Sequence, residues 1–150
     1  MNEAEEALAR ARRSLGRLEV LLESLDDDAS HRRTAAGWSV AGTLVHLAFY
    51  DDWVAGRWRR WLANGRFQDL PDDLTELVNA AGARGWNAVS AETAPALARD
   101  AGRGVVEVLG QLPAAALQDA VATGRLAMID RSVHWDPHLD EIESAIRNER

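Results

Sequence analysis

The chain contains no cysteine and no lysine among its 150 residues. Without cysteine it can form no disulfide, no thiolate metal site and no cysteine nucleophile, so any metal must be held by nitrogen and oxygen ligands. All 17 basic residues are arginine, and 24 acidic residues bring the net charge to −7. An acidic chain argues against a nucleic-acid partner, which requires a basic face.

Long apolar runs are also missing. No stretch approaches the length of a membrane span, and the acidic N-terminal segment 1–6 lacks the apolar core of a signal peptide. We therefore expect a cytoplasmic protein with no membrane partner. The sequence also lacks a glycine-rich phosphate loop and a serine in a nucleophile-elbow context, so nucleotide binding and serine-triad chemistry have no support.

Helical periodicity dominates what is present, and no segment shows convincing strand alternation. Four long segments carry apolar residues at spacings of three and four, at about 8–25, 40–63, 93–111 and 135–147. A short helix is expected after Pro71, and 114–132 is expected to be a connector with some helix. We expect Asp136 and Pro137 to supply the N-cap and first residue of the last helix.

This pattern predicts an all-α fold, a four-helix bundle that forms one domain over residues 1–150. Its core is expected to contain the apolar seams of the four segments, represented by Leu15, Leu18, Leu22, Leu44, Leu47, Leu97, Val105, Val108, Leu139 and Ile142.

Three of the four histidines are spaced like metal ligands. His134 and His138 are four apart, and side chains four apart share one face of a helix. His46 lies beside the apolar seam of the second segment, and helical bundles build metal sites from facing helices. The sequence therefore predicts a three-histidine site with open coordination positions, as in catalytic zinc centres. The other nitrogen of each ring is expected to donate to a carboxylate, a carbonyl or water.

Each of these histidines also has an ordinary interpretation, because a single histidine on a helix is more often structural or solvated. The i,i+4 pair favours the ligand interpretation. His31 lies in a polar segment and is interpreted as solvated. No His-Glu-x-x-His run is present, so the usual zinc-protease signature is absent.

Two motifs resemble those of the DinB-like superfamily. Residues 38–48 (WSVAGTLVHLA), with Trp53 downstream, are similar to its second-helix motif, and residues 134–142 (HWDPHLDEI) to its last-helix motif. The resemblance covers nearly the whole chain in order and spacing. The superfamily includes DinB/YfiT-type proteins, mycothiol- and bacillithiol-dependent S-transferases, and the N-terminal domain of mycothiol-dependent maleylpyruvate isomerase.

The resemblance implies a bundle of up-down-down-up topology, a divalent metal, usually zinc or nickel, and frequent homodimers. Carried over by position, the implied metal ligands are His46, His134 and His138. The expected activity is metal-dependent transfer of a low-molecular-weight thiol of the mycothiol type to small electrophiles.

Tyr50, Trp53 and Arg57 follow His46 on roughly its own helix face, so they are candidates for holding the thiol or the substrate. All three also have a simple packing interpretation. Two other functions stay open at this point. One is a hydrolase that uses metal-bound water with Asp52 or Asp136 as base. The other is a non-enzymatic, stress-linked bundle that binds a small ligand.

Overall fold

The computed structural model describes residues 1–148, and those residues form helices and connecting segments but no β-strand. The long helices are α1 (Glu3–Ser24), α3 (Val40–Asn64), α5 (Thr93–Gly110) and α7 (Ser132–Arg147). The shorter elements are α2 (Asp27–His31), α4 (Leu74–Trp86), α6 (Ala114–Ala122) and the 3₁₀ helix η1 (Leu126–Met128). The all-helical fold expected from the sequence is confirmed.

Local sequence explains where the long helices begin and end. Asn2 and Glu5 form a capping box at α1, in which each side chain accepts from the other residue's backbone N–H at 3.0 Å. Ser39 caps α3 by accepting from the backbone N–H of Gly42 at 2.9 Å. Gly65 ends α3 in the left-handed region, with φ of 72°, where glycine carries no steric penalty.

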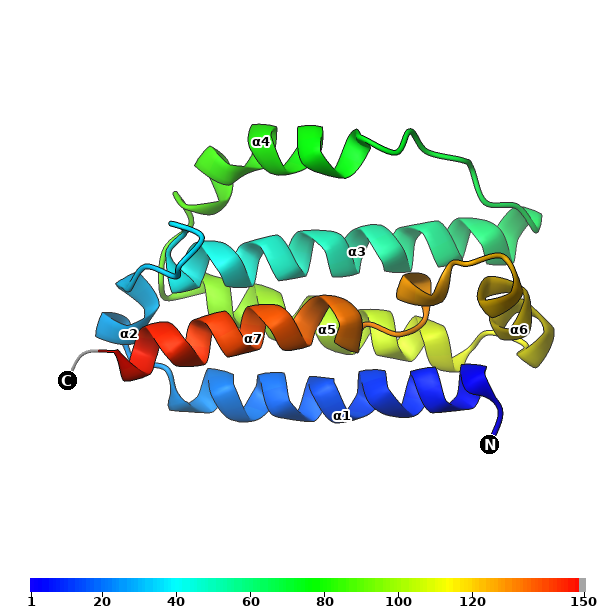
Figure 1. Cartoon of the computed structure of the whole chain (residues 1–150), viewed down its shortest axis with the longest axis horizontal. Helices are drawn as coiled ribbons and strands as arrows, with labels where there is room; N and C mark the ends of the chain where they lie inside the picture. The colour runs from blue at the N-terminus through cyan, green and yellow to red at the C-terminus, as the bar shows by residue number, and fades with distance from the viewer. Residues whose placement is uncertain (149–150) are drawn as a thin grey trace.

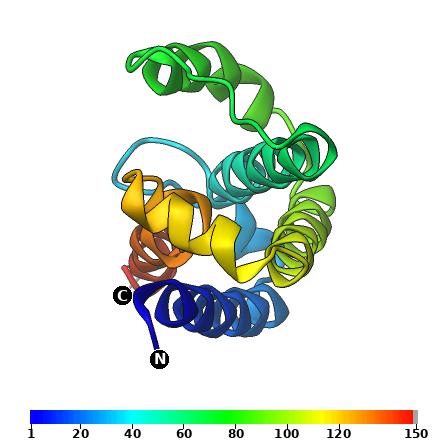
Figure 2. The same ribbon diagram turned by 90° about the vertical axis from the view of Figure 1, so that its right-hand side faces the viewer.

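The four long helices lie side by side (Figures 1 and 2). In Figure 1, α1 and α7 run from right to left, whereas α3 and α5 run from left to right. The chain must therefore cross the whole molecule between the end of α3 and the start of α5. The segment that contains α4 makes this crossing, and it lies on the outside of α3.

One buried apolar cluster joins the long helices. Most of the expected core residues are buried, and they are Leu18, Leu22, Leu44, Leu47, Val105, Val108, Leu139 and Ile142. Leu15 is only partly buried, and the expectation for Leu97 is wrong because that residue is 41% exposed. On α5 the buried positions are instead Ala94, Ala98, Ala101 and Val105, which share a face one position away from Leu97. These small side chains allow α5 to pack closely against α3.

The last helix begins earlier than expected. α7 starts at Ser132, so Pro137 is inside the helix rather than at its first turn. Asp130 provides the start, because its carboxylate accepts from the Ser132 backbone N–H at 3.1 Å and from the Ser132 hydroxyl at 2.5 Å. Proline removes the hydrogen bond to the carbonyl four residues back, which belongs to Val133, a residue that is 50% exposed. His134 and His138 therefore both lie within regular helix.

α4 covers the bundle loosely. It lies outside the four long helices, beyond α3 (Figure 2), and Trp86 is its one buried residue. Asn87, just after α4, accepts from the backbone N–H of Ser39 at 2.9 Å. Tyr50 of α3 donates to the side-chain oxygen of Asn79 at 2.8 Å. The two bonds hold α4 over the N-terminal half of α3.

Among residues 1–148, no helix combines the length and the apolar character that crossing a membrane requires.

Candidate metal centre

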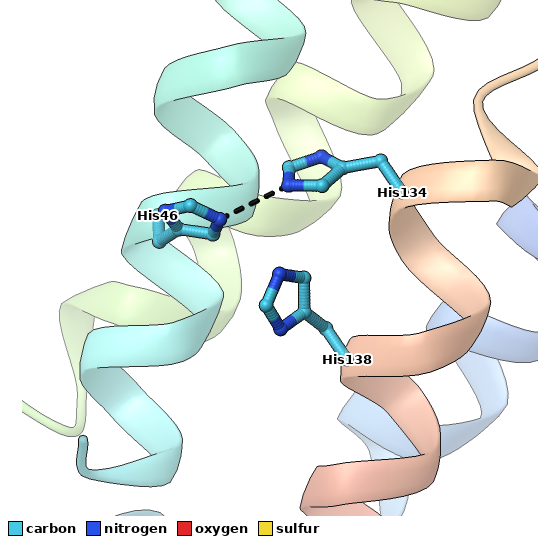
Figure 3. Close-up of side chains that lie close together, drawn as sticks. All are labelled: His46, His134 and His138. Atoms are coloured by element: carbon cyan, nitrogen blue, oxygen red, sulfur yellow. Dashed lines mark hydrogen bonds between the residues drawn. The ribbon is translucent and has the colours of Figure 1, made fainter. Parts of the chain in front are cut away.

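The three histidines predicted as ligands converge between two neighbouring helices. His46 projects from α3, and His134 and His138 project from α7 toward it (Figure 3). One ligand nitrogen from each ring lies within 4.8 Å of the other two. The predicted convergence of the three rings is therefore confirmed, whereas their role as metal ligands stays a prediction.

The distance between two of the rings suits a divalent ion held by imidazoles. The Nε2 atoms of His46 and His134 are 3.0 Å apart. Two nitrogens that share a tetrahedral zinc ion lie roughly 3.3 Å apart, since each Zn–N bond is about 2.0–2.1 Å. The His46 and His134 pair is therefore already at bridging distance. His138 completes the group of three, and among residues 1–148 no further histidine, cysteine, aspartate or glutamate joins it.

The protein environment keeps two of the candidate ligands neutral, which is the state that binds metal. Burial, with smaller contributions from the charges of His138 and Arg131, lowers the pKa of His46 from 6.5 to about 3. Burial also lowers the pKa of His134 to about 2, again with Arg131 contributing. Trp38, Tyr50 and Trp86 surround His46 with ring centroids 4.8–5.1 Å away, which accounts for its desolvation.

The outer nitrogens of the three rings have different partners. His138 meets the expectation, because its Nδ1 lies 3.2 Å from the carboxylate of Glu141 one turn later. The buried Nδ1 of His46 has no hydrogen-bond partner among residues 1–148. His134 contradicts the expectation. Its Nδ1 faces the guanidinium of Arg131 at 3.0 Å, and a guanidinium can only donate.

Arg131 is a buried charge that connects His134 to α3. Its Nε donates to Asp51 at 2.9 Å, and its Nη1 donates to the carbonyl of Ala127 at 3.0 Å. The second oxygen of Asp51 accepts from the indole N–H of Trp135 at 2.8 Å. Burial raises the pKa of Asp51 to about 6 against the opposing effect of Arg131. At neutral pH the pair is therefore an ionised bridge between α3 and α7.

Sequence reasoning missed both partners of this bridge. A signal for Asp51 was present, because it continues the spacing of the α3 seam between Leu47 and Val54 and is fully buried. A carboxylate in an apolar seam requires a buried partner, but the sequence does not show which arginine supplies it. Arg131 lies in the connector before α7, where no periodic pattern places it.

The histidines lie in the wall of a cavity of about 660 Å³. Tyr50, Trp53 and Arg57 line the same cavity, so the structure gathers every residue that the sequence suggested for the thiol or substrate. The Tyr50 hydroxyl is bonded to Asn79 of α4, and Nη2 of Arg57 donates to the carbonyl of Gln68 at 3.0 Å. The volume is in the range of small-molecule sites. Binding roles for these three residues stay predictions.

The carboxylates considered as bases lie elsewhere. Asp52 is exposed, and Asp136 faces α1, where it accepts from the Ser14 hydroxyl at 2.8 Å. Neither lines the cavity, whereas Glu141 does. Sequence reasoning missed Glu141, although its i,i+3 spacing from His138 is a readable signal. His31 is exposed as expected and takes no part in the cluster.

Comparison with known proteins adds no identification, because no family model, no curated protein and no solved structure matches the chain.

Proposed function

We propose that this protein is a divalent-metal enzyme of the DinB-like class that transfers a low-molecular-weight thiol of the mycothiol type to small electrophiles. His46, His134 and His138 would hold zinc or nickel. The observation that carries the proposal is the convergence of three imidazoles in the wall of a cavity large enough for a thiol and a small electrophile. The directions of the long helices in Figure 1 are those that the up-down-down-up topology requires, which supports the proposed class.

The side chains of the cavity have separate roles in this proposal. A bound divalent ion would supply the Lewis acidity that lowers the pKa of a thiol. Trp53 and Tyr50, which are stacked with ring planes 8° apart, provide a flat apolar wall for the electrophile. Arg57 provides positive charge for an anionic part of either reactant, at the end of the cavity away from His138. Homodimer formation, expected from the resemblance, stays a prediction.

Glu141 favours a second candidate function. It is the carboxylate that lines the cavity beside a proposed ligand, and a carboxylate in that place can accept a proton from water during hydrolysis. The two candidates differ in their requirement for a thiol, because hydrolytic turnover would proceed without one.

Replacing His46 by alanine tests the metal site and the reaction together. Purified wild-type protein loaded with zinc or nickel should carry about one ion per chain, and His46→Ala should retain less than about a tenth of that occupancy. Thiol transfer to 1-chloro-2,4-dinitrobenzene, in which a C–S bond forms, chloride leaves and the thiol proton passes to solvent, should fall in parallel. Elemental analysis and absorbance at the product band measure the two quantities.

His31→Ala is the matched control, because it removes an exposed imidazole far from the cluster and should change neither quantity. Full metal occupancy in His46→Ala would place the ion elsewhere and refute the ligand assignment. Normal metal content in wild-type protein with no thiol-dependent turnover, but with hydrolysis of an activated ester, would favour the hydrolase instead.

A further inference from the structure

A second, smaller pocket of about 290 Å³ adjoins the histidine cavity. The two share Trp53, Arg57 and Leu70 in their walls, so they are neighbours along the same side of α3. The smaller pocket lies between the C-terminal half of α3 and the segment that follows it. Three of its lining residues are arginines, namely Arg57, Arg60 and Arg66.

These arginines have no carboxylate partners. None of the ion pairs among residues 1–148 involves Arg57, Arg60 or Arg66, although the chain carries a net charge of −7. Asp69, which follows closely in sequence, pairs with Arg125 at 3.4 Å instead. In an acidic protein, three guanidiniums left unpaired around one concave site indicate a place for an external anion.

Neighbouring groups hold one of the three guanidiniums in position. Arg57 donates to the carbonyl of Gln68 and lies 5.3 Å from the centroid of the Phe67 ring. Arg125 lies 5.4 Å from the same centroid, so two like charges share one aromatic ring. Burial lowers the pKa of Arg57, and the charge of Arg125 lowers it as well, whereas the charge of Asp69 opposes both effects. An anion beside Arg57 would relieve that repulsion.

We propose that the pocket of Arg57, Arg60 and Arg66 binds the oxyanion group of a small molecule, a carboxylate or a phosphate. Guanidinium groups match both by paired N–H···O bonds, and the pocket volume suits a group of a few non-hydrogen atoms. Because the pocket adjoins the cavity through Trp53 and Arg57, the same molecule can extend toward the histidines. This last step rests on the proposed function, whereas the anion site itself does not.

Calorimetric titration of the chelator-treated protein with inorganic phosphate, and separately with succinate, tests the anion site at low ionic strength. The test variant is Arg60→Gln/Arg66→Gln. The matched control is Arg59→Gln/Arg84→Gln, which removes the same charge from two exposed arginines that do not line the pocket. We expect the test variant to weaken binding of the preferred anion at least about tenfold, since it removes two guanidinium groups that can form charge-assisted hydrogen bonds. The control should change it less than about twofold.

If both double variants weaken anion binding equally, the anion responds to net charge alone, and the proposal is overturned. Absence of anion binding to wild-type protein would also overturn it. The ratio of the phosphate and succinate affinities identifies the preferred oxyanion. His46→Ala should bind either anion as wild-type protein does. Failure of the proposed metal site would therefore not affect the proposed anion site. Conversely, if wild-type protein holds the metal but binds neither anion, only the anion site is refuted.

Discussion

At the scale of single residues, Arg131 sets the proton arrangement of the histidine cluster. Because a guanidinium can only donate, Nδ1 of His134 must accept from it, and the proton of the neutral ring is then on Nε2. That proton points toward Nε2 of His46 at 3.0 Å. A metal ion needs the Nε2 lone pair, so ion binding requires His134 to move its proton to Nδ1 and the Nη2 group of Arg131 to shift away from that nitrogen, while Nε stays bonded to Asp51.

This conflict predicts a change of tautomer. In metal-free protein at neutral pH, His134 should carry its proton on Nε2, and after loading with zinc it should carry it on Nδ1. Long-range ¹H–¹⁵N correlation spectra distinguish the two forms. His138 is the internal control, because its Nδ1 faces the carboxylate of Glu141 and should carry the proton in both states. An Nδ1 proton on His134 in the metal-free spectrum would contradict the hydrogen bond from Arg131.

At the scale of helices, two glycines of α3 should respond to alanine in opposite directions. A Cβ atom at Gly42 would lie 2.4 Å from the side-chain oxygen of Asn87, the group that fastens the end of α4 to Ser39. A Cβ atom at Gly56 meets nothing within 4 Å. Gly42→Ala should therefore lower the free energy of unfolding by about 1–3 kcal/mol. Gly56→Ala should raise it by about 0.5–1 kcal/mol through helix propensity.

Chemical denaturation of the two variants measures both effects with the same probe. Proteolysis within α4 adds a local readout, because a displaced Asn87 should make that helix easier to cleave in Gly42→Ala alone. Stability of Gly42→Ala equal to that of Gly56→Ala would show that Asn87 is not needed to hold α4.

The positions of the helices were largely predictable because periodicity and caps are local. Ser39 and Gly65 mark the limits of α3 in the sequence, and both act there in the structure. The start of α7 was not predictable from Asp136 and Pro137, because the carboxylate of Asp130 accepts from the first backbone N–H of the helix, at Ser132, and the helix tolerates an exposed proline. The choice of Ala98 over Leu97 for the α5 seam depends on how closely α3 approaches, which is a tertiary effect.

The histidine cluster was predictable because its spacing on α7 and its place beside the α3 seam are sequence properties. The groups that modulate it were not. Arg131 and Asp51 are 80 residues apart and meet only after α3 and α7 have packed. Arg57 and Arg60 of the second pocket are close in sequence, but Arg66 joins them, and all three lack a paired carboxylate, only in the folded molecule.

At the scale of the whole molecule, acid should destabilise the metal-free protein. In the unfolded chain, His46 and His134 bind protons below pH 6.5, their ordinary pKa. In the folded chain the pKa of His46 is about 3 and that of His134 about 2. Stability is therefore lost as pH falls, by about 1.4 kcal/mol per group and pH unit. Asp51 acts in the opposite direction between pH 6 and 3.8, because the folded state protonates it first. The net loss between pH 7 and pH 5 should be about 2–3 kcal/mol.

Urea unfolding in the presence of a chelator at several pH values measures this dependence. His46→Gln should flatten it, and the exposed His31→Gln should leave it unchanged. If the free energy of unfolding of His46→Gln depends on pH as steeply as that of wild-type protein, the pKa of the buried His46 is not lowered by its surroundings.

The ion pair of Asp51 and Arg131, with Trp135 as its third member, fixes α3 against α7 beside the histidines that those helices carry. Protein side chains alone thus hold the candidate metal site together, in contrast to small zinc modules that fold only around their metal. Stripping the ion should leave the scaffold standing and ready to be refilled. Under the proposed function, the identity of the bound metal would then depend on the supply of each ion in the surroundings and on the order of intrinsic affinities, in which copper and nickel compete strongly with zinc.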